Sequence, residues 1–153
     1  MSPIVYNGKL IAHVGGDGDG ALIAFDLDTG AEAWRWSEDG PGYSSPVIVR
    51  VGGRDQLVTQ TEQNILAVDG EWQNALDDTL LHSVQAELGH SVAFGDTLVF
   101  GGTRQPTFAV RVTGSTPAKL WESTDATLYM STPVRIGQRL CGFTRGRKGP
   151  YSA

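Results

Sequence analysis

The side chains best placed to hold a metal ion are two aspartates in the glycine-rich segment Gly15-Gly16-Asp17-Gly18-Asp19-Gly20. Calcium loops present carboxylate oxygens at alternate positions, but the next alternate position is Ala21 and no bidentate Glu ends the loop. The segment also leads into the strand-like run Ala21-Leu22-Ile23, whereas a phosphate-binding loop must open a helix. The pattern therefore favours a hairpin turn over a calcium or phosphate site.

Groups that could support nucleophilic or acid–base catalysis are scattered along the chain. His13, His82 and His90 share no metal-ligand spacing, and the sequence contains no Gly-x-Ser-x-Gly nucleophile elbow. We expect His13 to be a hydrogen-bonded strand residue, and the single Cys141 to be a buried strand residue with no disulfide partner in the chain. The basic segment Arg145 to Gly149 is typical of a solvated turn. We therefore expect no catalytic, cofactor-binding or metal-binding residues.

The composition narrows the classes of partner. The formal net charge is −5, from 17 acidic and 12 basic residues, and this balance argues against nucleic acid, which is bound by a basic face. No apolar run approaches the ~18 residues of a membrane span, so we expect no membrane span. No charged-then-apolar signal segment opens the sequence.

Short apolar or β-branched runs separated by glycine-rich turns predict a chain that is almost entirely β-strand. Asn7-Gly8 is a strong hairpin signal because both of its residues can adopt positive φ. In the first third of the chain the predicted strands are 4–6, 10–14, 21–25 and 32–36. Further along they are 47–51, 56–60 and 65–68, and then 92–94, 97–100, 107–112 and 119–122.

Two markers recur along these strands with a common period. Alanines at the ends of short β-like runs, Ala24, Ala67, Ala109 and Ala153, are separated by 43, 42 and 44 residues. The prolines of the Ser-Pro or Ser-Thr-Pro motifs, Pro3, Pro46 and Pro133, are separated by 43 and 87 residues. Four-stranded units of ~40 to 45 residues predict the blades of a β-propeller.

The period divides the chain into blade units at 3–45, 46–90, 91–132 and 133–153, the last of them incomplete. We therefore expect a propeller segment of about three and a half four-stranded antiparallel blades, cut at both ends. The tract 70–89 breaks the period: Leu76, Leu80, Val84 and Leu88 would line one face of a helix that binds a partner. An irregular blade edge or a corrupted stretch of sequence would also explain this tract.

One string in the first unit combines a strand end, a Thr-Gly turn and a strand that closes on Trp. Its marked residues are Ala24, Asp26, Thr29, Gly30 and Trp34, and a partial copy contains Ala109, Thr113, Gly114 and Trp121 with two extra residues before the Trp and no Asp. Gly30 and Gly114 can adopt the positive φ of a tight turn, and Asp26 or Asp28 can cap its N–H groups. We expect the turn to direct Trp34 and Trp121 onto the adjacent sheet, docking one blade against the next.

This string resembles the blade motif of the pyrroloquinoline-quinone-like repeat family, which reads Ala, any residue, Asp or Asn, two residues, Thr-Gly, three residues, Trp. The match at 24–34 is complete, and the segments 8–16, 56–61 and 129–134 are similar to exported bacterial propellers of the family. The resemblance covers most of the chain, with 70–90 as its weakest part.

The resemblance implies a noncatalytic, exported or periplasmic member that binds another protein through the loops at the blade ends, as a scaffold of outer-membrane assembly does. The alternative is a piece of a quinoprotein alcohol or sugar dehydrogenase. Such enzymes hold their cofactor and a cation at the propeller axis, with adjacent cysteines against the cofactor ring, and this chain has one Cys. A third expectation is self-association, because open blade edges and terminal apolar faces favour pairing with a second copy.

Overall fold

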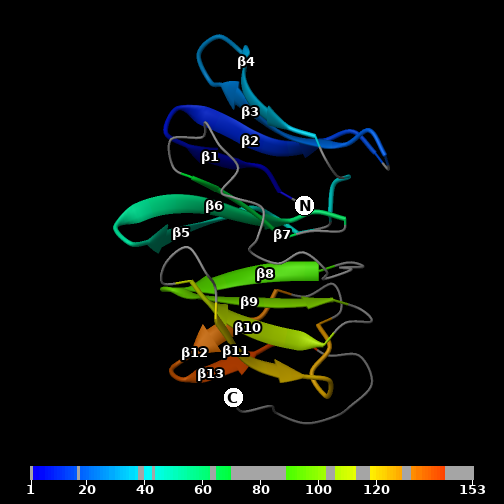
Figure 1. Ribbon diagram of the computed structural model, residues 1–153, viewed down its shortest axis with the longest axis vertical. Coiled ribbons are helices and arrows are strands. Elements are labelled where there is room, and N and C mark those ends of the chain that lie inside the picture. The colour runs from blue at the N-terminus through cyan, green and yellow to red at the C-terminus, as the bar shows by residue number, and fades with distance from the viewer. Residues whose placement is uncertain are drawn as a thin grey trace.

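The structure is a computed structural model (Figure 1). It describes residues 2–16, 18–37, 40–42, 44–62, 65–69, 89–102, 106–112, 118–128 and 132–143. Every extended regular element in these ranges is a β-strand, so the predicted all-β class is confirmed. The strands form antiparallel sheets that follow one another in chain order.

The first sheet contains four antiparallel strands in the order β1-β2-β3-β4. They are β1 (Ile4–Tyr6), β2 (Lys9–Val14), β3 (Ala21–Asp26) and β4 (Glu32–Trp36). The glycine-rich segment with Asp19 connects β2 to β3. Each strand lies within one or two residues of the range predicted from hydrophobic patterning.

The second sheet has three strands in the described part of the chain, in the order β5-β6-β7. They are β5 (Val47–Val51), β6 (Arg54–Gln60) and β7 (Ile65–Asp69). Residues 70–88 lie outside the described ranges, so the helix and the irregular edge considered for this tract stay predictions. Gly89, its last residue, opens the next strand.

The third sheet again has four strands, in the order β8-β9-β10-β11, and a two-stranded hairpin follows it. The strands are β8 (Gly89–Phe94), β9 (Thr97–Gly102), β10 (Thr107–Arg111), β11 (Ala118–Ser123), β12 (Val134–Ile136) and β13 (Arg139–Cys141). The third sheet begins two residues before the unit boundary expected at 90/91. Cys141 is a strand residue as predicted, but it is half-buried rather than buried.

All four sheets open with the same hairpin, in which a two-residue turn joins the first two strands. The pairs that close these turns are Tyr6↔Lys9, Val51↔Arg54, Phe94↔Thr97 and Ile136↔Arg139. Asn7 and Gly8 have φ of 48° and 71°, as the Asn-Gly pair predicts. The common hairpin places equivalent residues of the four sheets in register with one another.

Strand β6 shows how the sheets are held together. Leu57 and Val58 are both buried and, as neighbours in a strand, point to opposite faces of the second sheet. Leu57 joins a cluster with the first sheet, whereas Val58 joins a cluster with the third. The second sheet is therefore packed on both faces, each against one neighbour.

We call the face of a sheet that packs on the next sheet along the chain its forward face, and the opposite one its rear face. Ile11, Leu22 and Ala24 on the forward face of the first sheet contact Leu57, Leu66 and Val68 on the rear face of the second. Val49, Val58 and Ala67 on the forward face of the second contact Leu98, Phe100 and Val110 on the rear face of the third. Figure 1 shows the first sheet in blue and cyan at one end, the second in green, the third in yellow-green, and the orange β12–β13 hairpin beside the third.

Candidate functional site

The Thr-Gly turn between β3 and β4 is organised by one carboxylate. Asp26 Oδ1 accepts hydrogen bonds from the backbone N–H of Asp28 at 3.2 Å, from the backbone N–H of Thr29 at 2.9 Å and from Thr29 Oγ1 at 2.7 Å. Gly30 has φ of 71° and donates its N–H to the Asp26 carbonyl at 2.9 Å. Of the two aspartates predicted to cap the turn, the side chain of Asp26 does so. The polar groups of this motif therefore form their hydrogen bonds within the turn.

These hydrogen bonds stabilise the charged form of Asp26. The Thr29 hydroxyl has the largest effect, followed by the Thr29 backbone N–H, and together they hold the pKa of Asp26 below its ordinary value of 3.8. A group with a depressed folded-state pKa stabilises the fold above its unfolded pKa, and this contribution is lost as the pH falls through the folded value. Asp26 therefore stabilises the turn at neutral pH.

We expect Asp26→Ala to lower the urea midpoint of unfolding, because three hydrogen-bond donors of the turn lose their acceptor. Asp28→Ala is the matched control in the same turn, and it should leave the midpoint unchanged. The difference between wild type and Asp26→Asn should shrink as the pH is lowered below 3.8. Urea titrations over a range of pH values measure both effects, and equal loss in the Asp26 and Asp28 variants would contradict the assignment.

The Ala and the Trp of the motif are cross-strand neighbours. Ala24 pairs with Trp34 and Ala109 pairs with Trp121, and in both sheets a β-bulge follows directly after the pair. Both alanines have no exposed surface, so a small side chain is opposite the large ring in each case. The partial copy therefore keeps the pairing geometry of the complete motif.

The two extra residues before Trp121 lengthen the hairpin without moving this pair. Beyond the bulge, the first sheet has the single pair Phe25↔Glu32, whereas the third has Val110↔Lys119 and then Arg111↔Ala118. Thr113 and Gly114 lie outside the described residues, so their role in a turn stays a prediction.

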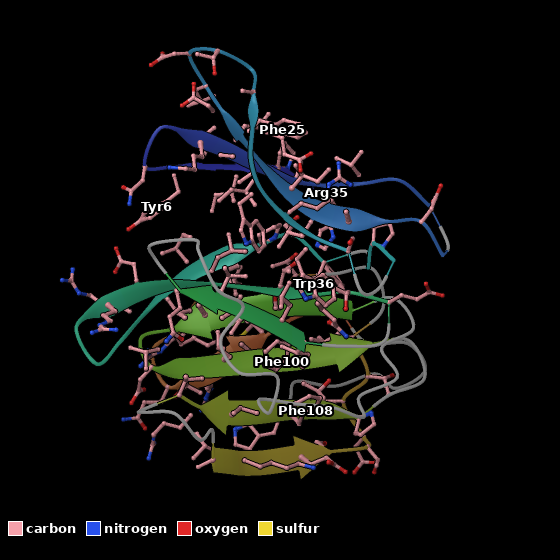
Figure 2. The ribbon with its side chains drawn as sticks, turned by 45° about the horizontal axis from the view of Figure 1, so that its top comes forward. Tyr6, Phe25, Arg35, Trp36, Phe100 and Phe108 are labelled. Atoms are coloured by element: carbon pink, nitrogen blue, oxygen red, sulfur yellow. The ribbon has the colours of Figure 1, made fainter. Side chains whose placement is uncertain are left out.

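Trp34 and Trp121 both lie on forward faces. Trp34 is half-buried and packs against the cluster that joins the first and second sheets. Trp121 is half-buried and lines a cavity together with residues of the β12–β13 hairpin. Figure 2 shows Trp36, which follows Trp34 on the same face, between the first and second sheets. The docking role of these rings stays a prediction with a direct test.

We expect Trp34→Ala to lower the free energy of unfolding by about 3 kcal/mol, the low end of the range for large aromatic truncations, because the ring is only half-buried. Thermal and urea denaturation measure this change. Leu27→Ala, an exposed apolar truncation in the adjacent turn, is the control and should have little effect. A Trp34→Ala variant with unchanged stability would show that the ring does not dock the two sheets.

The cavity beside Trp121 has a volume of about 250 Å³ and lies between the forward face of the third sheet and the hairpin. Val99 is buried at its wall, Phe94 and Trp121 are half-buried, and Arg135 and Arg139 are exposed at its rim. The guanidinium carbon of Arg135 lies 6.0 Å from the centre of the Phe94 ring, at the outer limit of cation–π contact. Two aromatic rings and two guanidinium groups therefore line the space between the third sheet and the hairpin.

Hydrogen bonds between side chains also join the sheets. His13 Nε2 lies 3.0 Å from Thr59 Oγ1, which confirms the prediction of a hydrogen-bonded strand histidine, and Tyr6 Oη donates to the carboxylate of Asp55. The hydroxyl of Ser44, in the connection before β5, lies 2.9 Å from that of Ser91 in β8 of the third sheet. Sequence reasoning did not single out Ser44, which directly precedes the Ser45-Pro46 marker.

Other side chains singled out from the sequence lie apart from one another or outside the described ranges. Asp19 Oδ1 accepts the Gly16 N–H at 3.0 Å, as in a hairpin turn, while Asp17 is not described. His82, the side chain of His90 and the basic segment 145–149 are also not described. Among the described residues no group of three or more His, Cys, Asp and Glu is placed to hold a metal ion. No helix in that part of the chain has the length and hydropathy to cross a membrane.

The fold defines the class of this protein: an all-β chain of stacked antiparallel sheets, in an arrangement compatible with the blades of a propeller. No family model matches the chain, and no curated protein matches it.

Proposed function

We propose that this chain is a noncatalytic scaffold of the pyrroloquinoline-quinone-like propeller type that binds another protein chain. The motif that resembles the family supports the scaffold role, because its Asp, Thr and Gly form a turn and its Ala–Trp pair lies at a sheet interface. By the same resemblance we propose that the protein acts in the periplasm or outside the cell.

The observation that carries the proposal is an exposed apolar face at each end of the stack. On the rear face of the first sheet Val5 is 58% and Val14 is 43% exposed, and Phe25 is half-buried. On the hairpin Val134 is 58% and Ile136 is 64% exposed. Large exposed apolar patches mark protein interaction sites in soluble proteins, and we propose that these two faces serve as such sites.

A photo-crosslinking experiment tests the binding role. The photoreactive residue p-benzoylphenylalanine is introduced separately at Phe25, at Ile136 and, as an exposed control away from both faces, at Arg54 in the turn of the second sheet. Irradiation of cells should give discrete protein adducts from the first two positions and none from the third. Equal adducts at all three positions, or none at the two faces, would overturn the proposal.

The noncatalytic character is tested on the purified chain. Dye-linked oxidation of alcohols and aldose sugars is measured in the presence of pyrroloquinoline quinone and Ca²⁺, and no turnover above the protein-free control is expected. Saturable turnover would instead favour the quinoprotein dehydrogenase.

A further inference from the structure

Of four equivalent positions on the forward faces of the described sheets, only the one in the last hairpin is exposed. Tyr6, Val51, Phe94 and Ile136 each close the two-residue turn of their sheet. Tyr6 packs against the cluster with the second sheet, Val51 is buried in the cluster with the third, and Phe94 lines the cavity beside the hairpin. Ile136 is 64% exposed. No sheet in the described part of the chain therefore packs on the forward face of the hairpin, where Ile136 lies.

On the rear faces, it is the first sheet whose residues are less buried than their equivalents in the other sheets. Phe25, Val68 and Val110 each follow the repeated Ala, and Val68 and Val110 are buried in the two clusters between sheets. Phe25 is only half-buried. Val5 is exposed, whereas its equivalent in the third sheet, Ala93, packs against the cluster with the second. Among the described residues, no sheet therefore packs on the rear face of the first sheet.

Both interfaces between sheets within the chain join a forward face to a rear face. The two exposed faces are one of each kind, because Arg135 and Leu140 of the hairpin line the cavity toward the third sheet and so direct Val134 and Ile136 away from it. A second copy of this chain therefore offers a forward face to the rear face of the first sheet, and a rear face to the forward face of the hairpin. Neighbouring sheets within the chain are paired in the same way.

We propose that the partner is a second copy of this chain, bound head to tail, with the rear face of the first sheet of one copy on the forward face of the β12–β13 hairpin of the other. This inference rests on the proposed binding function and identifies the partner. A head-to-tail contact is heterologous and closes into a ring when the rotation between copies allows it. The described part of one copy contains three sheets and a two-stranded hairpin, so that of two copies contains six sheets and two hairpins. Propeller rings typically contain about four to eight blades.

Sedimentation velocity of the purified chain tests the stoichiometry. Across the micromolar range we expect a concentration-dependent species of twice the 16.4 kDa chain mass. Val5→Lys and Ile136→Lys should each raise the dissociation constant at least tenfold, because a charge is placed in an apolar interface. Leu120→Lys, at an exposed position on the edge strand β11 of the third sheet, is the control and should leave it unchanged. Circular dichroism and thermal melts establish that each variant is folded.

Mixing the two interface variants distinguishes head-to-tail from symmetric pairing. The Val5→Lys chain keeps an intact hairpin face, and the Ile136→Lys chain keeps an intact first-sheet face. At a concentration where each variant alone is monomeric, an equimolar mixture should therefore form a heterodimer through one restored contact. If Val5→Lys alone abolishes association while Ile136→Lys leaves it unchanged, the first sheets pair with each other and the head-to-tail arrangement is wrong.

A wild-type chain that stays monomeric across the concentration range would overturn the inference. If Phe25 and Ile136 then still form adducts with other proteins in cells, the scaffold function stands with a different partner. Failure of the crosslinking experiment at both faces would overturn the scaffold function itself.

Discussion

Phe100→Ala is expected to lower the free energy of unfolding by about 3–5 kcal/mol, the range for truncating a large core aromatic. Phe100 has no exposed surface and belongs to the cluster that joins the second and third sheets. Its ring centre lies 5.4 Å from that of Phe108 in the adjacent strand β10, and Figure 2 shows both rings on the third sheet. The substitution therefore opens a cavity in the interface as well as removing apolar contact.

Phe143→Ala is the matched control, since it removes the same side chain from a position that is 83% exposed. Its effect should be within about 0.5 kcal/mol. Urea denaturation followed by tryptophan fluorescence measures both variants. Comparable losses for Phe100→Ala and Phe143→Ala would mean that the second and third sheets are not held by this cluster.

Gly42→Ala is expected to destabilise the fold by about 3 kcal/mol, the upper end of the range for overpacking. A Cβ at this position would lie 2.3 Å from the Gln60 carbonyl oxygen and 2.7 Å from that of Thr61. Both atoms belong to the backbone, so a side-chain rotation cannot relieve the overlap. The adjacent Gly40 carbonyl accepts the Glu62 N–H at 3.0 Å, which ties the connection after β4 to the end of β6.

Gly16→Ala is the control for this substitution, because the nearest atom to its added Cβ is Asp19 Oδ1 at 3.7 Å, an ordinary contact. Thermal denaturation should show a large loss for Gly42→Ala and little change for Gly16→Ala. A Gly42→Ala variant as stable as wild type would show that residues 40–42 do not approach β6 as closely as the structure places them.

Local sequence signals were sufficient for the features that depend on neighbouring residues. The Asn7-Gly8 turn and the alternation of strands and glycine turns follow from backbone preferences. The Asp26 cap follows from the short reach of an aspartate to the N–H groups after it. These features require no knowledge of the distant chain.

Contacts between sheets could not be predicted from such signals. Thr59 and Gln60 are polar, yet both are buried at the end of β6, and Thr59 meets His13 from a strand of another sheet. The Ser44–Ser91 contact likewise joins the connection before β5 to a strand of the third sheet. Periodicity identifies which residues share a face, but it contains no information on the hydroxyl or imidazole that meets them across an interface.

The added pair Arg111↔Ala118 has a consequence for how the blade hairpins can vary in length. Residues inserted between the Ala and the Trp in twos add one rung to the ladder and leave the inward and outward side chains of both strands as they were. A single inserted residue would have to be accommodated in the loop. Otherwise it would move the side chains of one strand to the opposite face of the sheet. Length variation in these hairpins should therefore favour even numbers, and a binding loop grafted between β10 and β11 should be tolerated best when it adds an even number of residues.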